Sequence, residues 1–534
     1  MPRSILIPPL LLAALACGGP AAAPLPSPGA PYDVVFSGGT VVDGSGSPGF
    51  RADVGVRGDR IVAVSRTPLD PGTARVIAIE GHVLAPGFID LHAHLDPIPQ
   101  LRDAESHVRQ GVTTALGGPD GGGPHPFGAY LANLENGGVG MNVGFLAGHN
   151  TIRRRVMGTA ARAPTPEELR RMEAMVAESM RDGAFGLSTG LFYVPGTYSE
   201  TAEVIALSRV AAAGGGIYTS HLRKEGLGLL DGVAEAIEIG RQAGIPVVLT
   251  HHKAVGRAMW GQSVTTLRMI DSARATGVDV MADVYPYTAT QTGLGALVPA
   301  WAMADGDSAF ARRTRDPVLR DSLHRDIVFN LENDRGGGDM RRVQFGNFRA
   351  EQWLEGKTLH DWVVQRGLPL TLASGADLVI EGMLRGGASM VYHVLDEPDV
   401  ERILAHPQSM VASDGRLTRP GDGVPHPRAY GTFPRVLARY VRERGILTLE
   451  QAVRKMTAMP ARRMGLTDRG TVAVGMMADL VVFDPATVAD LATFAAPHQY
   501  PTGIPYVMVN GRLMVDGGRF HDLRAGTVLR HRVP

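Results

Sequence analysis

The middle of the chain repeats one unit, in which a short apolar run of β-strand character is followed by a longer run with helical periodicity. Helical patterns such as PEELRRMEAMVAESMRDG (166–183) and GVAEAIEIGRQAG (232–244) separate most of the strand-like runs. The strand-like runs are 83–92, 112–117, 142–147, 184–188, 216–221, 246–251, 279–285 and 409–414. Eight strands alternating with helices predict an α/β fold built as a TIM (β/α)8 barrel.

Both ends of the chain show a different pattern, with short alternating apolar and polar runs broken by glycine turns. This pattern covers residues 32–82 and returns in residues 471–534. We therefore expect a barrel at 83–470 inserted into a small β-sandwich formed by both chain ends. The gap between the seventh and eighth strands is too long for one helix, so we expect an inserted lid or small subdomain at about 297–352.

The first 31 residues have the layout of an export signal followed by a tether. Arg3 precedes an apolar run at residues 5–16, and small residues follow, as in a secretory signal peptide. Cys17, the only cysteine of the chain, ends this run and resembles the lipidated cysteine of bacterial lipoprotein signals. We predict a signal peptide at 1–17, a Pro/Ala-rich linker at 18–31, and an exported periplasmic protein with a lipid anchor at Cys17. Ordinary signal cleavage nearby is the alternative.

Composition excludes several classes of partner and of structure. Lysine plus arginine equals aspartate plus glutamate at 53 each, so charge gives no case for binding nucleic acid or an anionic membrane surface. No apolar run of about 18 residues follows the first 17 positions, which predicts no transmembrane segment. A single cysteine also excludes disulfides within the chain. The oligomeric state is left open.

Two histidines, His92 and His94, end the first predicted barrel strand in the stretch FIDLHAHLD. Residues two apart on a strand point to the same side, so both imidazoles project from the carboxyl end of that strand. TIM-barrel active sites are built at this end of the barrel. Two imidazoles converging there suit a divalent metal such as zinc.

Other predicted strands also end in polar groups, and this strengthens the case for a metal site. The fifth strand ends with His221 in TSHLRKEG, and the sixth with the THHK stretch that contains His251, His252 and Lys253. Asp414 ends the eighth strand, and Asp120 lies just after the second. Five sites directly after apolar runs, on one rim of one barrel, predict a shared centre rather than separate buried polar residues.

Longer sequence blocks resemble one family within the amidohydrolase superfamily. They resemble the D-aminoacylases, the N-acyl-D-amino-acid deacylases, over roughly residues 32–520. The blocks are QGVTT (110–114), FGLSTGLFYVPG (185–196), TSHLRKEG (219–226), THHK (250–253), DVYPYTA (283–289), SDG (413–415) and HPRAYGTFPRVLARYVRERG (426–445). The resemblance implies a metal-dependent amidase with one or two divalent ions, zinc being expected.

The resemblance also implies roles for single residues. His92 and His94 become ligands of one metal position, and His221 and His251 become ligands of a second. Asp414 becomes the catalytic aspartate and a further ligand, taking the proton of a metal-activated water and passing it to the leaving nitrogen.

One position departs from the family pattern. Many D-aminoacylases carry a metal-ligating cysteine after the second strand, and the matching position in LGGPDGG is Asp120. A carboxylate can bridge two metals, so we expect Asp120 to be a ligand and to favour a two-metal site. The alternative for Asp120 is a turn aspartate among glycines and proline.

Substrate recognition is assigned by the same resemblance. Arg428, in HPRAYG, is expected to bind the free carboxylate of an N-acyl amino acid with its bidentate fork. Lys253 and Tyr285 match family positions that contact the same end of the substrate, and Tyr193 is a further candidate. At the family's serine position after YPY, this chain has Gln291.

The expected function is hydrolysis of N-acyl-D-amino acids to a carboxylate and a D-amino acid, with a small-molecule substrate. A first alternative is another amidohydrolase reaction, such as cyclic-amide hydrolysis or dipeptide cleavage. A second is a catalytically silent, metal-stabilised binding protein. Stereochemistry enters only through the resemblance, and the sequence gives no preference for side chain or acyl group.

Overall fold

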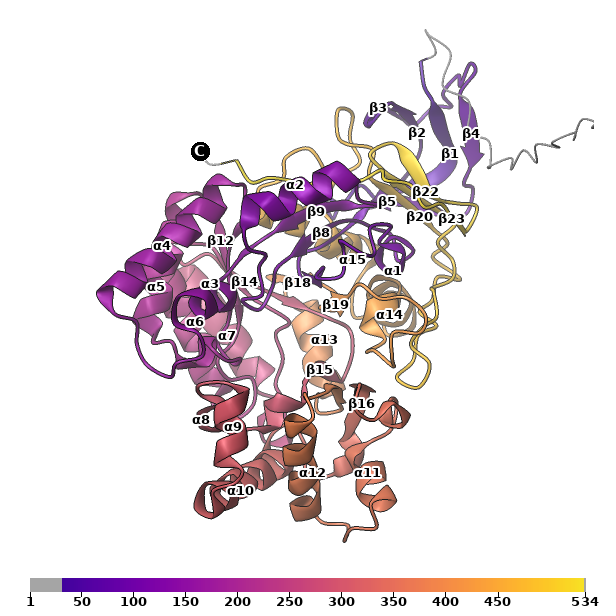
Figure 1. Cartoon of the computed structure of the whole chain (residues 1–534). Helices are drawn as coiled ribbons and strands as arrows, with labels where there is room; N and C mark the ends of the chain where they lie inside the picture. Colours follow the sequence, from indigo (N-terminus) through magenta and orange to yellow (C-terminus); the bar gives the residue numbers. More distant parts are fainter. Residues whose placement is uncertain (1–30, 533–534) are drawn as a thin grey trace, which may run out of the picture.

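The computed structural model describes residues 31–532, and its centre is the expected eight-stranded parallel barrel (Figure 1). The barrel strands are β6 (Phe88–Asp90), β8 (Val112–Gly117), β9 (Asn142–Phe145) continued by β10 (Ala147–Gly148), β11 (Gly186–Gly190), β12 (Ile217–His221), β13 (Val247–Leu249), β14 (Val280–Val284) and β18 (Ser409–Val411). The first and eighth units are joined through a short parallel pair, β7 (Ala93–His94) with β19 (Gly415–Arg416). This pair directly follows β6 and β18, so it brings the ends of both strands together.

Helices surround the barrel, and two of them begin with capping boxes. Thr165 and Glu168 form a reciprocal capping box at the start of α4, with Pro166 in the first turn. The same device, with Thr448 and Gln451, starts α15. The surrounding helices are α1 (Glu105–Val108), α2 (Phe127–Gly137), α3 (His149–Met157), α4 (Pro166–Arg181), α5 (Thr201–Ala213), α6 (Leu229–Ala243), α7 (Ser263–Ala275), α13 (Glu397–Ala405), α14 (Arg428–Arg435) with the π-helix η6 (Val436–Glu443), α15 (Leu449–Met456) and α16 (Ala458–Arg463).

The predicted first barrel strand, 83–92, is in fact two strands in two sheets. Residues of β5 (Val83–Pro86) pair with the amino-terminal β1 (Val34–Val41) and the carboxyl-terminal β20 (Leu480–Phe483), whereas only β6 belongs to the barrel. Gly87 makes the transition, and a Cβ there would lie 2.2 Å from the Thr113 side chain. The apolar run is continuous across this junction, so its pattern gave no sign of the change of sheet. The β-rich domain therefore extends to residue 86 rather than 82.

Both chain ends build one separate β-rich domain, as expected. Its nine strands form a single sheet with a buried core drawn from both ends of the chain. The strands are β1 (Val34–Val41), β2 (Phe50–Arg57), β3 (Arg60–Ser65), β4 (Arg75–Ala78), β5, β20 (Leu480–Phe483), β21 (Tyr506–Val509), β22 (Arg512–Asp516) and β23 (Arg519–Phe520). Beyond β23 the chain returns to the barrel, where the Val143 amide donates to the Thr527 carbonyl at 3.0 Å.

The inserted subdomain is longer than the expected 297–352. It runs from β15 (Thr290–Gly293) to β17 (Ser389–Tyr392), which pair with each other and with β16 (Val343–Asn347), and it has its own apolar core. Its strands are far apart in sequence, so the sequence pattern did not mark its end. Its helices are α8 (Ala300–Met303), α9 (Asp307–Arg313), α10 (Pro317–Asn333), α11 (Leu359–Gln365) and α12 (Leu372–Leu384).

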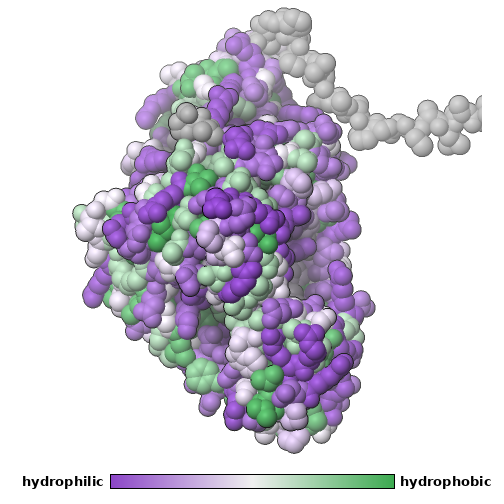
Figure 2. Space-filling view, turned by 60° about the vertical axis from the view of Figure 1, so that its left-hand side comes forward, coloured by the Kyte–Doolittle hydropathy of each residue, from purple (hydrophilic) through white to green (hydrophobic). Residues whose placement is uncertain are grey.

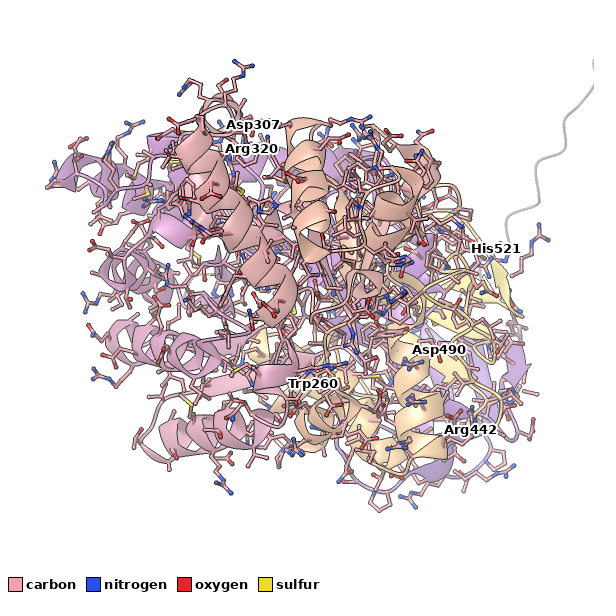
Figure 3. The ribbon with its side chains drawn as sticks, turned by 90° about the horizontal axis from the view of Figure 1, so that it is seen from below. Trp260, Asp307, Arg320, Arg442, Asp490 and His521 are labelled. Atoms are coloured by element: carbon pink, nitrogen blue, oxygen red, sulfur yellow. The ribbon has the colours of Figure 1, made fainter. Side chains whose placement is uncertain are left out.

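The surface mixes hydrophilic and hydrophobic residues on the face that Figure 2 shows. Viewed from below, helices of the inserted subdomain that carry Asp307 and Arg320 lie over one part of the barrel, and Arg442 and Asp490 lie together at another edge (Figure 3). There the Arg442 guanidinium donates to the Val488 carbonyl at 2.8 Å. None of the helices between residues 31 and 532 combines the length and apolar character that a membrane span requires. The predicted signal peptide, Cys17 and nearly all of the linker lie outside the described residues.

Gly186 is a position where a side chain should break the barrel. Its φ is +149°, and a Cβ would lie 1.9 Å from the Ile217 carbonyl oxygen on the neighbouring strand. We expect Gly186→Ala to lower the free energy of unfolding by about 3 kcal/mol or more, because backbone atoms must move. Gly293→Ala is the matched control, since its nearest atom is 3.8 Å away and should cost under about 0.5 kcal/mol. Equal denaturation midpoints for the two variants would contradict this account.

Candidate metal centre

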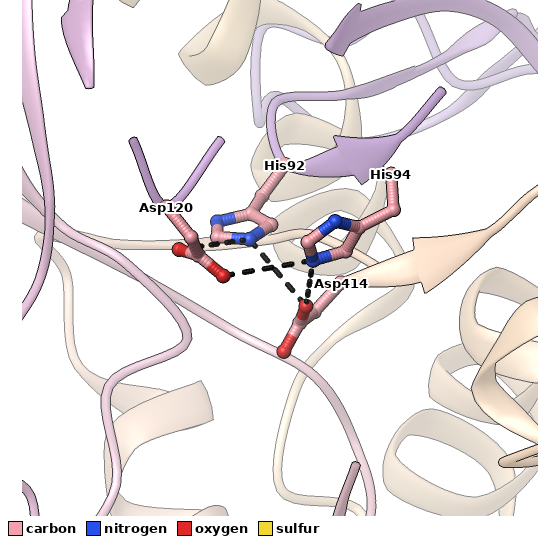
Figure 4. Close-up of side chains that lie close together, drawn as sticks. All are labelled: His92, His94, Asp120 and Asp414. Carbon is pink, nitrogen blue, oxygen red and sulfur yellow. Dashed lines mark hydrogen bonds and ion pairs between the residues drawn. The ribbon is translucent and has the colours of Figure 1, made fainter. Parts of the chain in front are cut away.

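Four side chains from three separate strand ends converge at the carboxyl end of the barrel (Figure 4). His92 Nε2 lies 3.4 Å from Asp414 Oδ1 and 3.6 Å from Asp120 Oδ1. His94 Nε2 lies 3.1 Å from Asp414 Oδ1 and 3.5 Å from Asp120 Oδ2. These donor atoms lie within 4.8 Å of one another, so they can reach one common ion.

A second donor group adjoins the first and shares Asp120 with it. His251 Nε2 lies 3.3 Å from Asp120 Oδ1, and His221 Nδ1 lies 3.7 Å from Asp120 Oδ2. The His92 and His251 ring centroids are 4.8 Å apart, so the two groups are in direct contact. The structure therefore brings together all six residues that the sequence predicted as ligands, in two sets with one carboxylate in common.

The loops that carry these side chains have unusual backbone conformations. Asp120, His251 and Asp414 have φ values of +54°, +37° and +50°, which non-glycine residues rarely adopt. Neighbouring polar groups hold the Asp120 loop, since Ser188 Oγ donates to the Gly118 carbonyl at 2.6 Å and accepts from the Gly121 amide at 3.1 Å. These conformations turn the side chains away from the strand direction and toward the shared centre.

Asp90 holds the loop of Asp414 in place, as Ser188 holds the loop of Asp120. This role of Asp90 was not predicted from the sequence. Asp90 Oδ1 accepts from the amides of His92 and Ser413, at 3.2 and 3.0 Å, and its other oxygen accepts from the Ser413 hydroxyl. The Asp414 amide in turn donates to the His92 carbonyl at 2.8 Å. Burial raises the pKa of Asp90 to about 6, against these hydrogen bonds. One buried carboxylate thus ties the loops of His92 and Asp414 together.

Electrostatics keep the site carboxylates ionised. Burial by itself raises the pKa of Asp414, but Arg428, whose Nη1 lies 2.7 Å from Asp414 Oδ2, and the nearby His251 and His92 hold it well below its usual range. The pKa of Asp120 is likewise well below its usual range, because His92 and His251 outweigh the effect of burial. Both carboxylates are therefore negative and able to bind a cation at neutral pH.

Several of the donor atoms are buried and lack hydrogen-bond partners within residues 31–532, which also favours a bound divalent ion. His92 Nε2, His221 Nδ1, His251 Nε2 and Asp120 Oδ1 are buried, and none has a hydrogen-bond partner among the described residues. Buried polar atoms are nearly always satisfied, so such a cluster points to a missing partner. Imidazole and carboxylate are the ligand types of zinc and similar ions. The residues present thus fit one or two divalent metals.

A cavity of about 380 Å³ opens beside the two donor groups. Of the residues predicted to bind substrate, Tyr193, Lys253 and Tyr285 line it, as does Gln291 from the inserted subdomain. Arg428 lies behind Asp414, and its guanidinium stacks 4.8 Å from the centroid of the Tyr285 ring. Lys253 Nζ is buried and lies 2.5 Å from Glu225 Oε1.

Four charged residues of the cavity were not predicted from the sequence: Asp96, Arg154, Glu225 and Arg335. Glu225 follows His221 by four residues in TSHLRKEG, and that spacing was the available signal. Arg335 comes from the inserted subdomain, and its Nη2 lies 3.3 Å from Glu225 Oε2. No local pattern connects it to the barrel, so only the folded structure reveals it.

Comparisons with known proteins agree with this geometry. Residues 364–515 match the Amidohydrolase family. The N-acyl-D-glutamate deacylase of Alcaligenes xylosoxydans xylosoxydans is 39% identical and covers 90% of this chain and 93% of its own length. The D-aminoacylase of the same organism is 38% identical, over 93% of this chain and 98% of its own.

Solved structures give the same result. A D-aminoacylase crystal structure superposes with a TM-score of 0.81 at 37% identity, covering 94% of this chain and all of its own. The N-acyl-D-glutamate deacylase of Bordetella bronchiseptica, complexed with zinc and a phosphonate mimic of the tetrahedral intermediate, has a TM-score of 0.79 at 35% identity, covering 93% and 99%. The chain belongs to the D-aminoacylase family of amidohydrolases, the N-acyl-D-amino-acid deacylases.

Proposed function

We propose that this protein hydrolyses the amide bond of N-acyl-D-amino acids and that it depends on divalent metal for this reaction. The observation that carries the proposal is the pair of donor groups that share Asp120 beside a cavity of small-molecule size. The D-aminoacylase and N-acyl-D-glutamate deacylase similarities support the substrate class. Free N-acyl amino acids are small, and a cavity of about 380 Å³ is within the usual range for such ligands.

We assign the metal ligands by proximity. His92, His94 and Asp414 serve one position, His221 and His251 serve the other, and Asp120 serves both. Zinc is the proposed ion, because imidazole and carboxylate suit it and the Bordetella bronchiseptica relative was solved with zinc. A divalent ion bound here supplies a lowered pKa for bound water and polarises the substrate carbonyl.

Asp414 is the proposed general base and acid. Its Oδ1 faces the imidazole nitrogens of His92 and His94, whereas its Oδ2 is held by Arg428. An ionised Asp414 accepts a proton from the attacking water and passes it to the leaving nitrogen. Because Arg428 fixes the carboxylate in one orientation, the oxygen that takes the proton stays directed at the centre.

The substrate carboxylate is proposed to bind near Tyr285. The Arg428 guanidinium and the Lys253 ammonium lie 4.8 and 5.8 Å from the centroid of this ring, so two cations converge on it. The Tyr285 hydroxyl is buried without a hydrogen-bond partner among the described residues. It can therefore donate to an incoming carboxylate. Tyr193, across the cavity, is proposed to contact the rest of the substrate.

Asp414→Asn should lose at least 100-fold in kcat for N-acetyl-D-amino acids while zinc content stays within a factor of two, because the amide still coordinates but accepts no proton. Steady-state kinetics with zinc analysis of the same samples checks this.

The wild type should hydrolyse N-acetyl-D-amino acids in preference to their L enantiomers, hydantoins and dipeptides. Equal use of both enantiomers, or faster hydantoin hydrolysis, favours another amidohydrolase reaction. No hydrolysis of any amide by the zinc-loaded wild type favours a binding protein.

Arg428→Met should shift the pH dependence of catalysis. The pKa of Asp414 is lower in the folded chain than in the unfolded chain. The ionised carboxylate therefore stabilises the fold at pH values above the unfolded pKa, and this stabilisation is lost as the pH falls through the folded pKa. Removing Arg428 raises the pKa of Asp414, so the acid limb of kcat/KM moves to higher pH, and stability falls by about 3 kcal/mol because a buried carboxylate loses its partner. Equal acid limbs for wild type and variant would count against the ion pair as the cause.

We also propose export to the periplasm with a lipid anchor at Cys17. The support is the sequence layout, with Arg3, an apolar run and one cysteine at its end. A Pro/Ala-rich tether then separates the anchor from the folded part, which begins near residue 32.

Cys17→Ala tests this directly in cells that express the full chain. The wild type should incorporate radiolabelled palmitate and sediment with membranes, whereas the variant should incorporate none and be released into the soluble fraction. The proposed anchor is wrong if both proteins remain unlabelled, and the export signal is wrong if the amino-terminal segment stays uncleaved.

A further inference from the structure

We infer that Glu225 positions the proposed second metal pair by accepting the ring protons of both His221 and His251, and so fixes the tautomer of each. The inference rests on the proposed metal dependence but goes beyond the ligand assignment. Glu225 is 2% exposed, belongs to neither donor group, and faces the outer ring nitrogens of His221 and His251. It is therefore a positioning residue and not a ligand.

The two imidazoles lie between two carboxylates. On the inner side, His221 Nδ1 and His251 Nε2 face Asp120 at 3.7 and 3.3 Å. On the outer side, His221 Nε2 lies 3.3 Å from Glu225 Oε2, and His251 Nδ1 lies 3.1 Å from Glu225 Oε1. Each histidine thus uses opposite ring nitrogens for the two carboxylates, and each oxygen of Glu225 serves one ring.

Metal binding by an imidazole determines which of its two ring nitrogens carries the proton. A neutral imidazole carries one proton, so the nitrogen that binds a cation must be bare and the other must carry the proton. A protonated nitrogen in a buried site needs an acceptor. Glu225 supplies one to both rings, and this places the free electron pairs of His221 Nδ1 and His251 Nε2 toward Asp120.

Two cations keep Glu225 able to accept. Lys253 Nζ lies 2.5 Å from its Oε1, and Arg335 Nη2 lies 3.3 Å from its Oε2. Lys253 Nζ is also 2.6 Å from His251 Nδ1. Because an ammonium can only donate, Nδ1 gives its proton to Glu225 only when Lys253 Nζ turns away from the ring and donates to Glu225 and to the His251 carbonyl, 2.8 Å away.

The other histidine pair has no such shared acceptor. His92 Nδ1 is 4.0 Å from Asp283 Oδ2, beyond hydrogen-bond distance. His94 Nδ1 is 3.9 Å from the carboxylate of the exposed Asp96. A change at Glu225 should therefore affect the His221/His251 position and leave the His92/His94 position intact. This selectivity separates a positioning role from a general loss of stability.

Glu225→Gln is the informative variant, because an amide is almost the same size but offers one acceptor and one donor. Whichever way the amide turns, one histidine then faces an N–H group and must present its own proton to the metal side. We expect one zinc ion of the loaded full-length chain to bind about 10- to 100-fold more weakly, with the other unchanged. Competition with increasing concentrations of a chromophoric chelator measures the affinity of each zinc ion. The total zinc per chain is measured in parallel.

Glu203→Gln is the matched control. Glu203 is also a buried carboxylate on the barrel, and it accepts from His149 Nε2 at 2.8 Å and pairs with Arg153, but it faces neither donor group. It should lower thermal stability without changing zinc competition. If Glu225→Gln also lowers only the thermal midpoint, and its competition curve overlays that of the wild type, Glu225 has a structural role alone and the inference is overturned.

The competition curve also separates this inference from the proposed reaction. A wild type that binds zinc but hydrolyses no N-acyl-D-amino acid would refute the proposed function, while the Glu225→Gln curve would still report on the tautomers. In a chain that carries His92→Ala and His94→Ala, only the His221/His251 group remains. Adding Glu225→Gln to that chain should weaken its zinc binding by the same factor, and an unchanged affinity would overturn the inference.

Discussion

The site depends on a single carboxylate, because Asp120 alone belongs to both donor groups. Its two oxygens are divided between four imidazoles, at distances of 3.3 to 3.7 Å. A buried carboxylate is costly unless positive charge or hydrogen bonds compensate it. Four rings from three strand ends surround Asp120, and this shared carboxylate holds the two donor groups next to each other.

Holding that convergence requires strained loops on a rigid support. Three of the site residues have positive φ, a conformation that costs on the order of 1–3 kcal/mol per residue. The strain persists because buried polar side chains, such as Ser188 and Asp90, hold the loops from behind. These supports lie on strands β11 and β6 of the closed barrel, so the apolar core of the barrel offsets the cost at its rim.

The sequence predicted most of this arrangement, and the failures have physical causes. The alternation of strand-like and helical runs predicted the barrel. Histidine and aspartate directly after apolar runs predicted that six side chains would meet at one rim, because parallel strands end there. The split of residues 83–92 was missed because apolar periodicity does not say which sheet a strand joins. Arg335 and the full inserted subdomain were missed because their contacts join residues far apart in sequence, where no pattern connects them.

The three carboxylates around the centre differ in whether a lysine or arginine neutralises them, and this difference explains why a cation binds there. Asp414 has Arg428 as a partner, and Glu225 has Lys253 and Arg335, so both carboxylates are neutralised from the outer side. Among the described residues, Asp120 has no lysine or arginine partner and faces only imidazoles. Neutral imidazoles cannot cancel its charge, and protonated ones cannot bind a metal. Asp120 is therefore the carboxylate whose burial a divalent cation compensates, and the two donor groups meet at this residue.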